Sequence, residues 1–171
     1  MHPQRVKAHR SFGVTIDVIW PQQTAAEPVG ARNPAILYGL GNLLENAVDF
    51  ARDRVEVAAA WDNEAVAVTI TDDGPGFPSE IIGRIGEPYL RGERPPDSRA
   101  MEKTVGLGLG FFIAKTLLER SGAAITVRNQ PAPQHGAVIR VVWSRVDFER
   151  PRPYASADGS SALEGLTGYK M

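Results

Sequence analysis

Three short stretches decide the fold of this chain: NLLENA at residues 42–47, DDGPG at 72–76 and GLGLG at 106–110. The first has two carboxamides four residues apart, which is the spacing of neighbours on one face of a helix. The second places a carboxylate directly before a glycine turn. The third runs into a helical apolar pattern, so its glycines open a helix. Together they predict a site where a helix face, a turn and a helix N-terminus meet around a nucleotide.

Strand-like and helix-like patterns alternate along the rest of the chain. Alternation of apolar and polar residues predicts five strands, at 13–20, 55–60, 65–71, 123–128 and 137–143. Helical spacing predicts helices at 34–52, with Asn33 as its cap, and at 109–120, and a short helix with a turn is expected between 78 and 91. Because consecutive hairpins argue against a doubly wound parallel sheet, the predicted fold class is an α/β (α+β) two-layer sandwich. Its helices cover one face of a mixed, mostly antiparallel sheet.

The length of 171 residues fits one domain. We expect a flexible N-terminal segment over residues 1–12 and one folded domain over residues 13–146. A polar, proline-containing loop at 92–105 interrupts this domain, and the tail over residues 147–171 is expected to be disordered.

Composition excludes several classes of function. The net charge is −1, from 19 basic and 20 acidic residues, so no overall field attracts nucleic acid or anionic lipid. There is no cysteine, which excludes disulfides and thiolate metal sites. The apolar stretches are shorter than the roughly 20 residues of a membrane span, and the first ten residues lack the apolar core of a signal peptide. We therefore expect a soluble, cytoplasmic domain.

Each of the three stretches also has a plain structural interpretation. Asn42 and Asn46 fit a metal site, because an amide oxygen is a neutral hard ligand suited to Mg²⁺, but they also fit a solvated helix face. Asp72 fits recognition of an adenine amino group, which the oxygen of guanine would not match, but the turn also forms without a ligand. The glycines of the third stretch fit phosphates at a helix N-terminus, or a hinge. Their joint occurrence favours the nucleotide.

The same residues resemble the N, G1 and G2 boxes of the GHKL, or Bergerat-fold, ATPase superfamily, in particular the catalytic ATP-binding (HATPase_c) domain of bacterial sensor histidine kinases. The stretch EPYLR at 87–91 resembles the F box, which lies between G1 and the lid over ATP. The resemblance covers residues 13–143. Residues 106–123 are most similar to the redox-responding RegB/PrrB/ActS group. The resemblance to the superfamily implies a Bergerat fold, with the catalytic domain at 13–146 and its lid at 92–105.

The resemblance also implies roles for individual residues. Asn46 would hold Mg²⁺ and Asn42 would support the triphosphate region. Arg91 would approach the γ-phosphate, where a guanidinium offsets developing charge. These three form the expected catalytic set. The expected ATP-binding residues are Asn46, Asp72 (at the adenine amino group), Gly74, Gly76, Tyr89, Lys103, Gly106, Leu107, Gly108, Leu109 and Gly110. ATP and Mg²⁺ are the implied cofactors.

Asp49 departs from the pattern of this family, because many sensor kinases have Lys or Arg one turn after the metal-binding Asn. A carboxylate near phosphates is unfavourable unless Mg²⁺, or the guanidinium groups of Arg52 and Arg54, offset its charge. The consequence of Asp49 for phosphate contacts stays open at the level of sequence.

Asn42 favours phosphoryl transfer over hydrolysis. GHKL hydrolases such as gyrase B, Hsp90 and MutL are similar in fold, but they carry a glutamate base four residues before the metal-binding Asn. An amide has no useful basicity, and Glu45 lies about 100° round the helix from Asn46. The implied reaction is transfer of the γ-phosphoryl group of ATP to a histidine, followed by relay to a response regulator.

None of the three histidines, His2, His9 and His135, has the sequence context of a phosphorylated sensor-kinase histidine. We expect the acceptor on a dimerisation/histidine-phosphotransfer domain absent from this chain. The chain would then be the C-terminal part of a larger kinase in the inner membrane, with no contact to membrane or nucleic acid by this domain. Two alternatives remain: an anti-sigma-factor-type GHKL serine kinase, and a nucleotide-binding module without transfer activity.

Overall fold

The computed structural model describes residues 4–11, 13–20, 25–83, 85 and 107–150. The strands in these ranges are β1 (Gln4–Ser11), β2 (Val14–Trp20), β3 (Arg54–Trp61), β4 (Ala65–Asp72), β5 (Ala123–Asn129) and β6 (Ala137–Ser144). The helices are α1 (Pro34–Phe50), α2 (Ser79–Ile82), α4 (Leu107–Arg120) and α5 (Arg145–Glu149).

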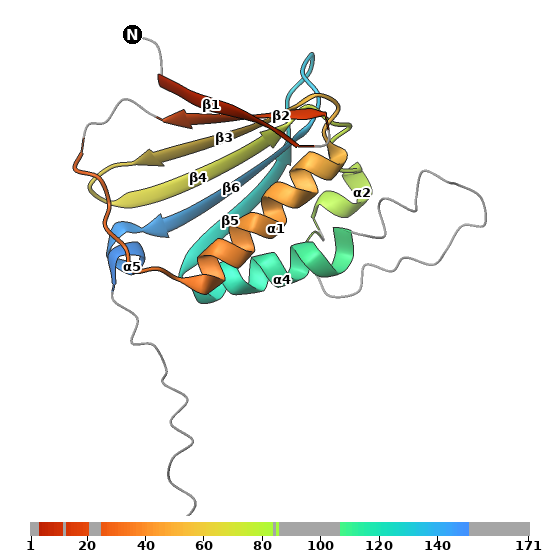
Figure 1. The fold of residues 1–171 in the computed structure, drawn as a ribbon. Coiled ribbons are helices and arrows are strands. Elements are labelled where there is room, and N and C mark those ends of the chain that lie inside the picture. Colours follow the sequence, from red (N-terminus) through yellow and green to blue (C-terminus); the bar gives the residue numbers. More distant parts are fainter. Residues whose placement is uncertain (1–3, 12, 21–24, 84, 86–106, 151–171) are drawn as a thin grey trace, which may run out of the picture.

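The six described strands form one sheet in the order β1-β2-β3-β4-β6-β5. The β2–β3 pair is parallel, and the other four pairs are antiparallel. Helices α1 and α4 lie side by side over one face of this sheet (Figure 1). The predicted two-layer sandwich with a mixed, mostly antiparallel sheet is therefore confirmed.

Helix α1 connects the two parallel strands β2 and β3, so it must cross the sheet. It begins where the side chain of Asn33 accepts a hydrogen bond of 3.0 Å from the N–H of Ala35, with Pro34 in the first turn. Leu43 and Ala47 are buried on the face toward the sheet. The predicted helix is thus confirmed, and it ends at Phe50 rather than at residue 52.

The core lies between this helix layer and the sheet. Its buried residues are Val14, Leu43, Ala47, Val55, Ile70, Phe111, Ala114, Leu118, Ala123, Ile139, Val141 and Trp143. The polar residue Ser121 is buried beside them: it accepts a hydrogen bond of 2.8 Å from the indole N–H of Trp143 and donates one of 2.6 Å to the carbonyl of Leu118. The indole N–H therefore has a partner inside the core, as a buried donor requires.

The N-terminal residues differ from the expectation of a flexible segment over 1–12. Residues Gln4–Ser11 form β1, which pairs antiparallel with β2 at the edge of the sheet. The segment is polar and charged, which hides a strand from an apolar pattern but is common in edge strands, since pairing there is made by backbone groups. The expectation is therefore wrong for these eight residues.

The C-terminal boundary also differs, because α5 continues the fold past residue 146, where a disordered tail was expected to begin. The hydroxyl of Ser144 caps this helix by accepting from the N–H of Asp147. Phe148 packs edge-to-face on Trp143, with ring centroids 5.7 Å apart. The helix and this aromatic contact extend the domain to Glu149, and the rest of the expected tail, residues 151–171, lies outside the described residues.

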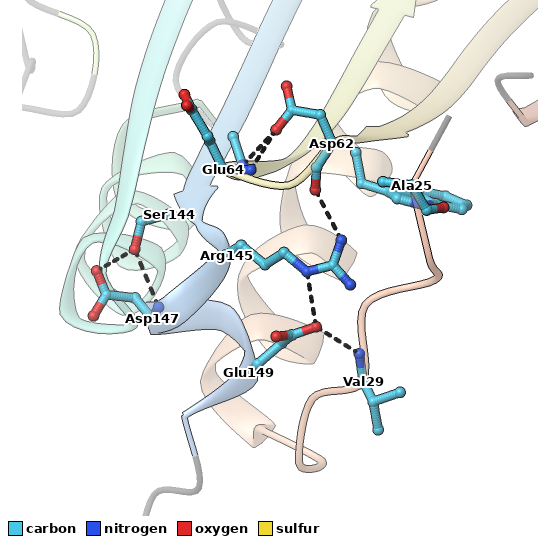
Figure 2. Close-up of polar contacts among 10 residues, drawn as sticks. Ala25, Val29, Asp62, Glu64, Ser144, Arg145, Asp147 and Glu149 are labelled. Carbon is cyan, nitrogen blue, oxygen red and sulfur yellow. Dashed lines mark hydrogen bonds and ion pairs between the residues drawn. The ribbon is translucent and has the colours of Figure 1, made fainter. Parts of the chain in front are cut away.

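Arg145 joins α5 to two other segments at this end of the sheet (Figure 2). Its guanidinium donates 3.0 Å to Glu149 and 2.8 Å to the carbonyl of Asp62 in the β3–β4 turn. Glu149 in turn accepts from the N–H of Val29, in the segment that leads into α1. This network fixes the start of α1 at the end of the sheet opposite Asp72. None of the helices in the described ranges has the length and apolar character needed to span a bilayer.

Candidate functional site

A cavity of about 270 Å³ opens beside the C-terminal half of α1, at the end of β4. Its lining residues are Asn46, Ala47, Phe50, Asp72, Pro75, Gly76, Phe77, Pro78, Phe111, Ala137 and Ile139. Most of these residues are apolar, and the two with polar side chains are Asn46 and Asp72. A largely apolar cavity with a few converging polar groups is typical of a small-molecule site. The fold thus joins the first two of the three sequence stretches with Phe111, which directly follows the third.

Asp72 is the polar end of this cavity, where β4 stops. It is 6% exposed. Its Oδ1 accepts hydrogen bonds from the N–H groups of Gly74, at 2.9 Å, and Ala137, at 3.2 Å. Burial raises the pKa of Asp72, although these two hydrogen bonds act to lower it. The carboxylate is therefore oriented by its Oδ1 atom, and Oδ2 is the acceptor that remains for a ligand.

The carboxylate of Asp73 makes different contacts from that of Asp72. Its carboxylate accepts from the N–H groups of Arg52, at 2.8 Å, and Asp53, at 3.2 Å, where α1 turns into β3. Partial burial acts to raise the pKa of Asp73, but hydrogen bonds from the backbone of residues 52–54 outweigh it, and the pKa is lowered. Asp73 therefore ties the end of α1 to the turn after β4.

Asn42 and Asn46 lie on the face of α1 that meets the first turn of α4. The side-chain NH₂ of each donates to the carbonyl four residues earlier, Asn42 to Tyr38 and Asn46 to Asn42, both at 2.8 Å. Because a carbonyl accepts only from a donor, this leaves the amide oxygens for other partners. A Cβ placed on Gly110 would lie 3.8 Å from Asn42 Oδ1 and 4.0 Å from Asn46 Nδ2. The amide face thus lies next to the start of α4, with both side chains partly exposed.

The remaining expected site residues fall into two groups. Gly74 packs so closely that a Cβ there would lie 2.3 Å from the carbonyl oxygen of Phe50, and Leu107, Gly108 and Leu109 belong to the first turn of α4. That turn presents unpaired backbone N–H groups and the positive end of the helix dipole. Outside the described residues lie Tyr89, Arg91, Lys103, Gly106 and the lid expected at 92–105.

Asp49 is exposed and does not line the cavity. The guanidinium of Arg54 pairs with Asp17 of β2, so it is committed to the sheet and does not offset the charge of Asp49. Arg52 is exposed. Of the two guanidinium groups that the sequence offered for Asp49, that of Arg54 is therefore paired with another carboxylate.

Residues at the end of β5 and in the β5–β6 loop also support the cavity near Asp72, and they were not among the residues predicted from the sequence. Asn129 accepts 2.8 Å from the N–H of Phe77 and donates 2.7 Å to its carbonyl. Gln130 donates 2.9 Å to the carbonyl of Asp72 and 3.0 Å to that of His135. Gly136 has a φ of 122°, and a Cβ there would lie 1.9 Å from the Asp72 carbonyl oxygen. Apart from the contact between Gln130 and His135, these contacts join residues that are 52 to 64 positions apart in the sequence, and no local pattern of residue types indicates them.

The family model described as "Histidine kinase-, DNA gyrase B-, and HSP90-like ATPase" matches residues 33–147. The sensor histidine kinase RegB of Cereibacter sphaeroides is 44% identical over 127 residues, covering 68% of this chain and 28% of RegB. The sensor histidine kinase CpxA of Escherichia coli K12 is 29% identical over 112 residues, covering 65% of this chain and 23% of CpxA. The chain therefore spans about a quarter of the length of each of these relatives.

Two solved structures show the same arrangement of elements. The mycobacterial sensor histidine kinase MprB aligns with a TM-score of 0.53 and 26% identity, over 67% of this chain and 74% of that chain. Full-length ShkA in complex with AMPPNP aligns with a TM-score of 0.54 and 26% identity, over 75% of this chain and 25% of that chain.

Proposed function

The chain belongs to the family of histidine kinase-, DNA gyrase B- and HSP90-like ATPases, and from this premise we propose that it is the ATP-binding catalytic domain of a RegB-like sensor histidine kinase. One observation carries the proposal. Asn46 and Asp72 line one cavity, and Gly110, at the start of α4, lies against the amides of Asn42 and Asn46. A base site, a metal-binding oxygen and a phosphate-binding helix end are thus within reach of a single nucleotide.

The chemistry of the walls sets the direction in which ATP lies. The purine occupies the apolar part of the cavity, where Phe77 and Phe111 pack edge-to-face on each other with centroids 6.4 Å apart and both line the wall, and its amino group donates to Asp72. The phosphates extend along α1 to the amides and the first turn of α4, where helix N-terminal N–H groups favour anions.

Mg²⁺ fits the donor set of this face. The NH₂ of Asn46 is already bonded to its own helix, so its Oδ1 is a neutral oxygen ligand. Mg²⁺ usually takes one or two protein ligands and completes its shell with phosphate oxygens and water. Asn46 would hold the ion, which would neutralise phosphate charge during transfer.

The residues at this face favour transfer over hydrolysis. Asn42 stands where GHKL hydrolases carry a glutamate base, and its amide NH₂ donates to the carbonyl of Tyr38. Glu45 is exposed and does not line the cavity. Without a base to activate water, the γ-phosphoryl group passes to an external nucleophile, a histidine of a dimerisation domain, and then to a response regulator. Arg91 at the γ-phosphate, with Tyr89 and Lys103 at the nucleotide, completes the proposed site.

The 44% identity to RegB supports a place in the redox-responding group. Because the chain has no cysteine, a sensing thiol would lie in another part of such a kinase. The parent protein would be anchored in the inner membrane, with this domain in the cytoplasm.

The test combines the chain with γ-³²P-labelled ATP, Mg²⁺ and the dimerisation domain of the parent kinase made as a separate protein. We expect label on the dimerisation domain that is lost in acid and retained in base, and no label when its acceptor histidine is replaced. Asn46→Ala is the matched control for the ATP site and should abolish transfer. An acid-stable, base-labile ester would favour the serine kinase, and normal ATP binding without transfer would favour the nucleotide-binding module.

A further inference from the structure

We propose that Asn129 and Gln130 are positioning residues that fix the two sides of the purine slot, and that Gln130 thereby sets the preference for a 6-amino purine. The inference rests on the proposed function, because it takes adenine as the ligand. Neither residue lines the cavity, so each would act through a residue that does.

Gln130 acts on the polar side of the slot. Its side-chain NH₂ donates to the carbonyl of Asp72 at 2.9 Å and to that of His135 at 3.0 Å, while its backbone N–H donates to Gly136 at 2.9 Å. One side chain thus joins the end of β4 to the loop that leads into β6, whose first residue, Ala137, donates its N–H to Asp72 Oδ1. Asp72 is held by its carbonyl from the loop and by its carboxylate from the start of β6.

Close packing leaves little freedom in this arrangement. A Cβ on Gly136 would lie 1.9 Å from the carbonyl oxygen of Asp72, so the loop backbone contacts the end of β4 directly. The carboxylate can therefore turn its second oxygen toward the ligand only in the orientation that the loop imposes. Removing the Gln130 amide releases one of the hydrogen bonds that hold the loop against β4.

Asn129 acts on the apolar side of the slot. Its amide accepts from the N–H of Phe77 at 2.8 Å and donates to the carbonyl of the same residue at 2.7 Å, as a neighbouring strand would. It also lies against Gly76, where an added Cβ would be 2.8 Å from Asn129 Oδ1. The side chain thus fixes Gly76 and Phe77, both of which line the cavity.

Two consecutive residues therefore position opposite sides of the slot, and their loss should have different signatures. Gln130 acts through the group that reads the 6-position, so its loss should reduce discrimination at that position. Asn129 acts through the wall that contacts the ring, so its loss should weaken all purines alike. General damage to the pocket would also weaken all purines alike, so a changed ATP/ITP ratio is the signature that only the positioning role of Gln130 produces.

The experiment titrates the chain with ATP and with ITP, which carries a 6-oxo group where ATP carries the 6-amino group, by calorimetry in the presence of Mg²⁺. For Gln130→Met we expect ATP affinity to fall roughly tenfold, the effect of one hydrogen bond, with little change for ITP. Gln130→Glu keeps the size but replaces the donor by an acceptor, and should behave in the same way. Asn129→Leu should weaken ATP and ITP equally. Gln134→Met is the matched control, because Gln134 lies exposed in the same loop and should leave both affinities unchanged.

A double-mutant cycle separates positioning from general damage. If Gln130 acts through Asp72, adding Gln130→Met to Asp72→Asn should leave the ATP/ITP ratio of the single Asp72→Asn variant unchanged. An unaltered ratio in both Gln130 variants, additive effects in the cycle, or the same change in Gln134→Met would overturn the inference. A wild-type chain that binds neither nucleotide would instead overturn the proposed function.

Discussion

The substitution Asp72→Asn is the sharpest test of how the cavity selects its base. Oδ1 of Asp72 accepts from two backbone N–H groups, at 2.9 and 3.2 Å. An asparagine must keep its oxygen there to satisfy these donors, so its NH₂ takes the place of Oδ2. A donor then faces the amino group of adenine, where an acceptor was needed.

The size of the effect follows from the lost bond. A hydrogen bond to a charged acceptor contributes about 1.5–3 kcal/mol, which corresponds to a loss in ATP affinity of roughly 10- to 150-fold. ITP should bind more tightly than to the wild type, because its 6-oxygen accepts from the new NH₂. Calorimetric titration with both nucleotides measures the two changes. ATP affinity within about twofold of the wild-type value would refute the assignment of Asp72 to the base.

The same carboxylate predicts a pH dependence. Binding of the amino group requires the ionised form, so ATP affinity is complete above the pKa of Asp72 and is lost as the pH falls through it. Because burial raises this pKa, the loss should begin at a higher pH than for an ordinary aspartate, and Asp72→Asn should remove it. Titrations between pH 4 and 8, with the stability of the fold monitored in parallel, measure the effect.

The stability of the nucleotide-free protein should depend on pH in the opposite sense from ATP affinity. A raised carboxyl pKa means that the stabilising contribution of Asp72 is complete below its unfolded pKa and is lost as the pH rises through its folded pKa. At neutral pH the buried charge therefore destabilises the fold, and Asp72→Asn should increase the free energy of unfolding in urea without nucleotide. A decrease would show that its hydrogen bonds outweigh its burial.

Three other changes test the core, the loop and the metal face. Ser121→Ala should lower the free energy of unfolding in urea by about 1–3 kcal/mol, because it leaves the buried N–H of Trp143 without its partner; adding Trp143→Phe should remove most of this coupling. Gly136→Ala should lower the midpoint of thermal unfolding by several degrees or prevent folding, since both its φ of 122° and a 1.9 Å approach to the carbonyl of Asp72 exclude a Cβ; an unchanged midpoint would contradict this packing. Asn46→Ala should make ATP affinity insensitive to Mg²⁺ in calorimetry, whereas an unchanged response to the metal would place the ion elsewhere.

Local pattern was enough to predict most elements of the fold. The start of α1 and the turn before β4 are each encoded by neighbouring residues. These are Asn33-Pro34 at the helix start and Asp62-Asn63 in the hairpin. Strand β1 was not predicted because it pairs with the backbone of β2, and such pairing needs no apolar pattern in the sequence. Helix α5 was not predicted because a helix of five residues is too short to show a period. Its contacts with Trp143 and Asp62 are tertiary.

For the candidate site, the motifs pointed to Asn46 and Asp72, which the structure places on one cavity. Their roles toward ATP and Mg²⁺ stay predictions. The supporting amides of Asn129 and Gln130 were missed because what they contact is backbone, and any chain segment offers a carbonyl. Residue type therefore identifies the groups that touch a ligand more readily than the groups that hold them in place.

The bonds from Asp73 to the N–H groups of Arg52 and Asp53 also bear on the spacing of the two polar groups in the cavity. Asn46 lies about one turn before the end of α1 at Phe50, and Asp72 directly precedes Asp73. A shift of α1 along its axis would have to break the bonds to Asp73. The separation of Asn46 and Asp72 is therefore set by the fold before any ligand binds.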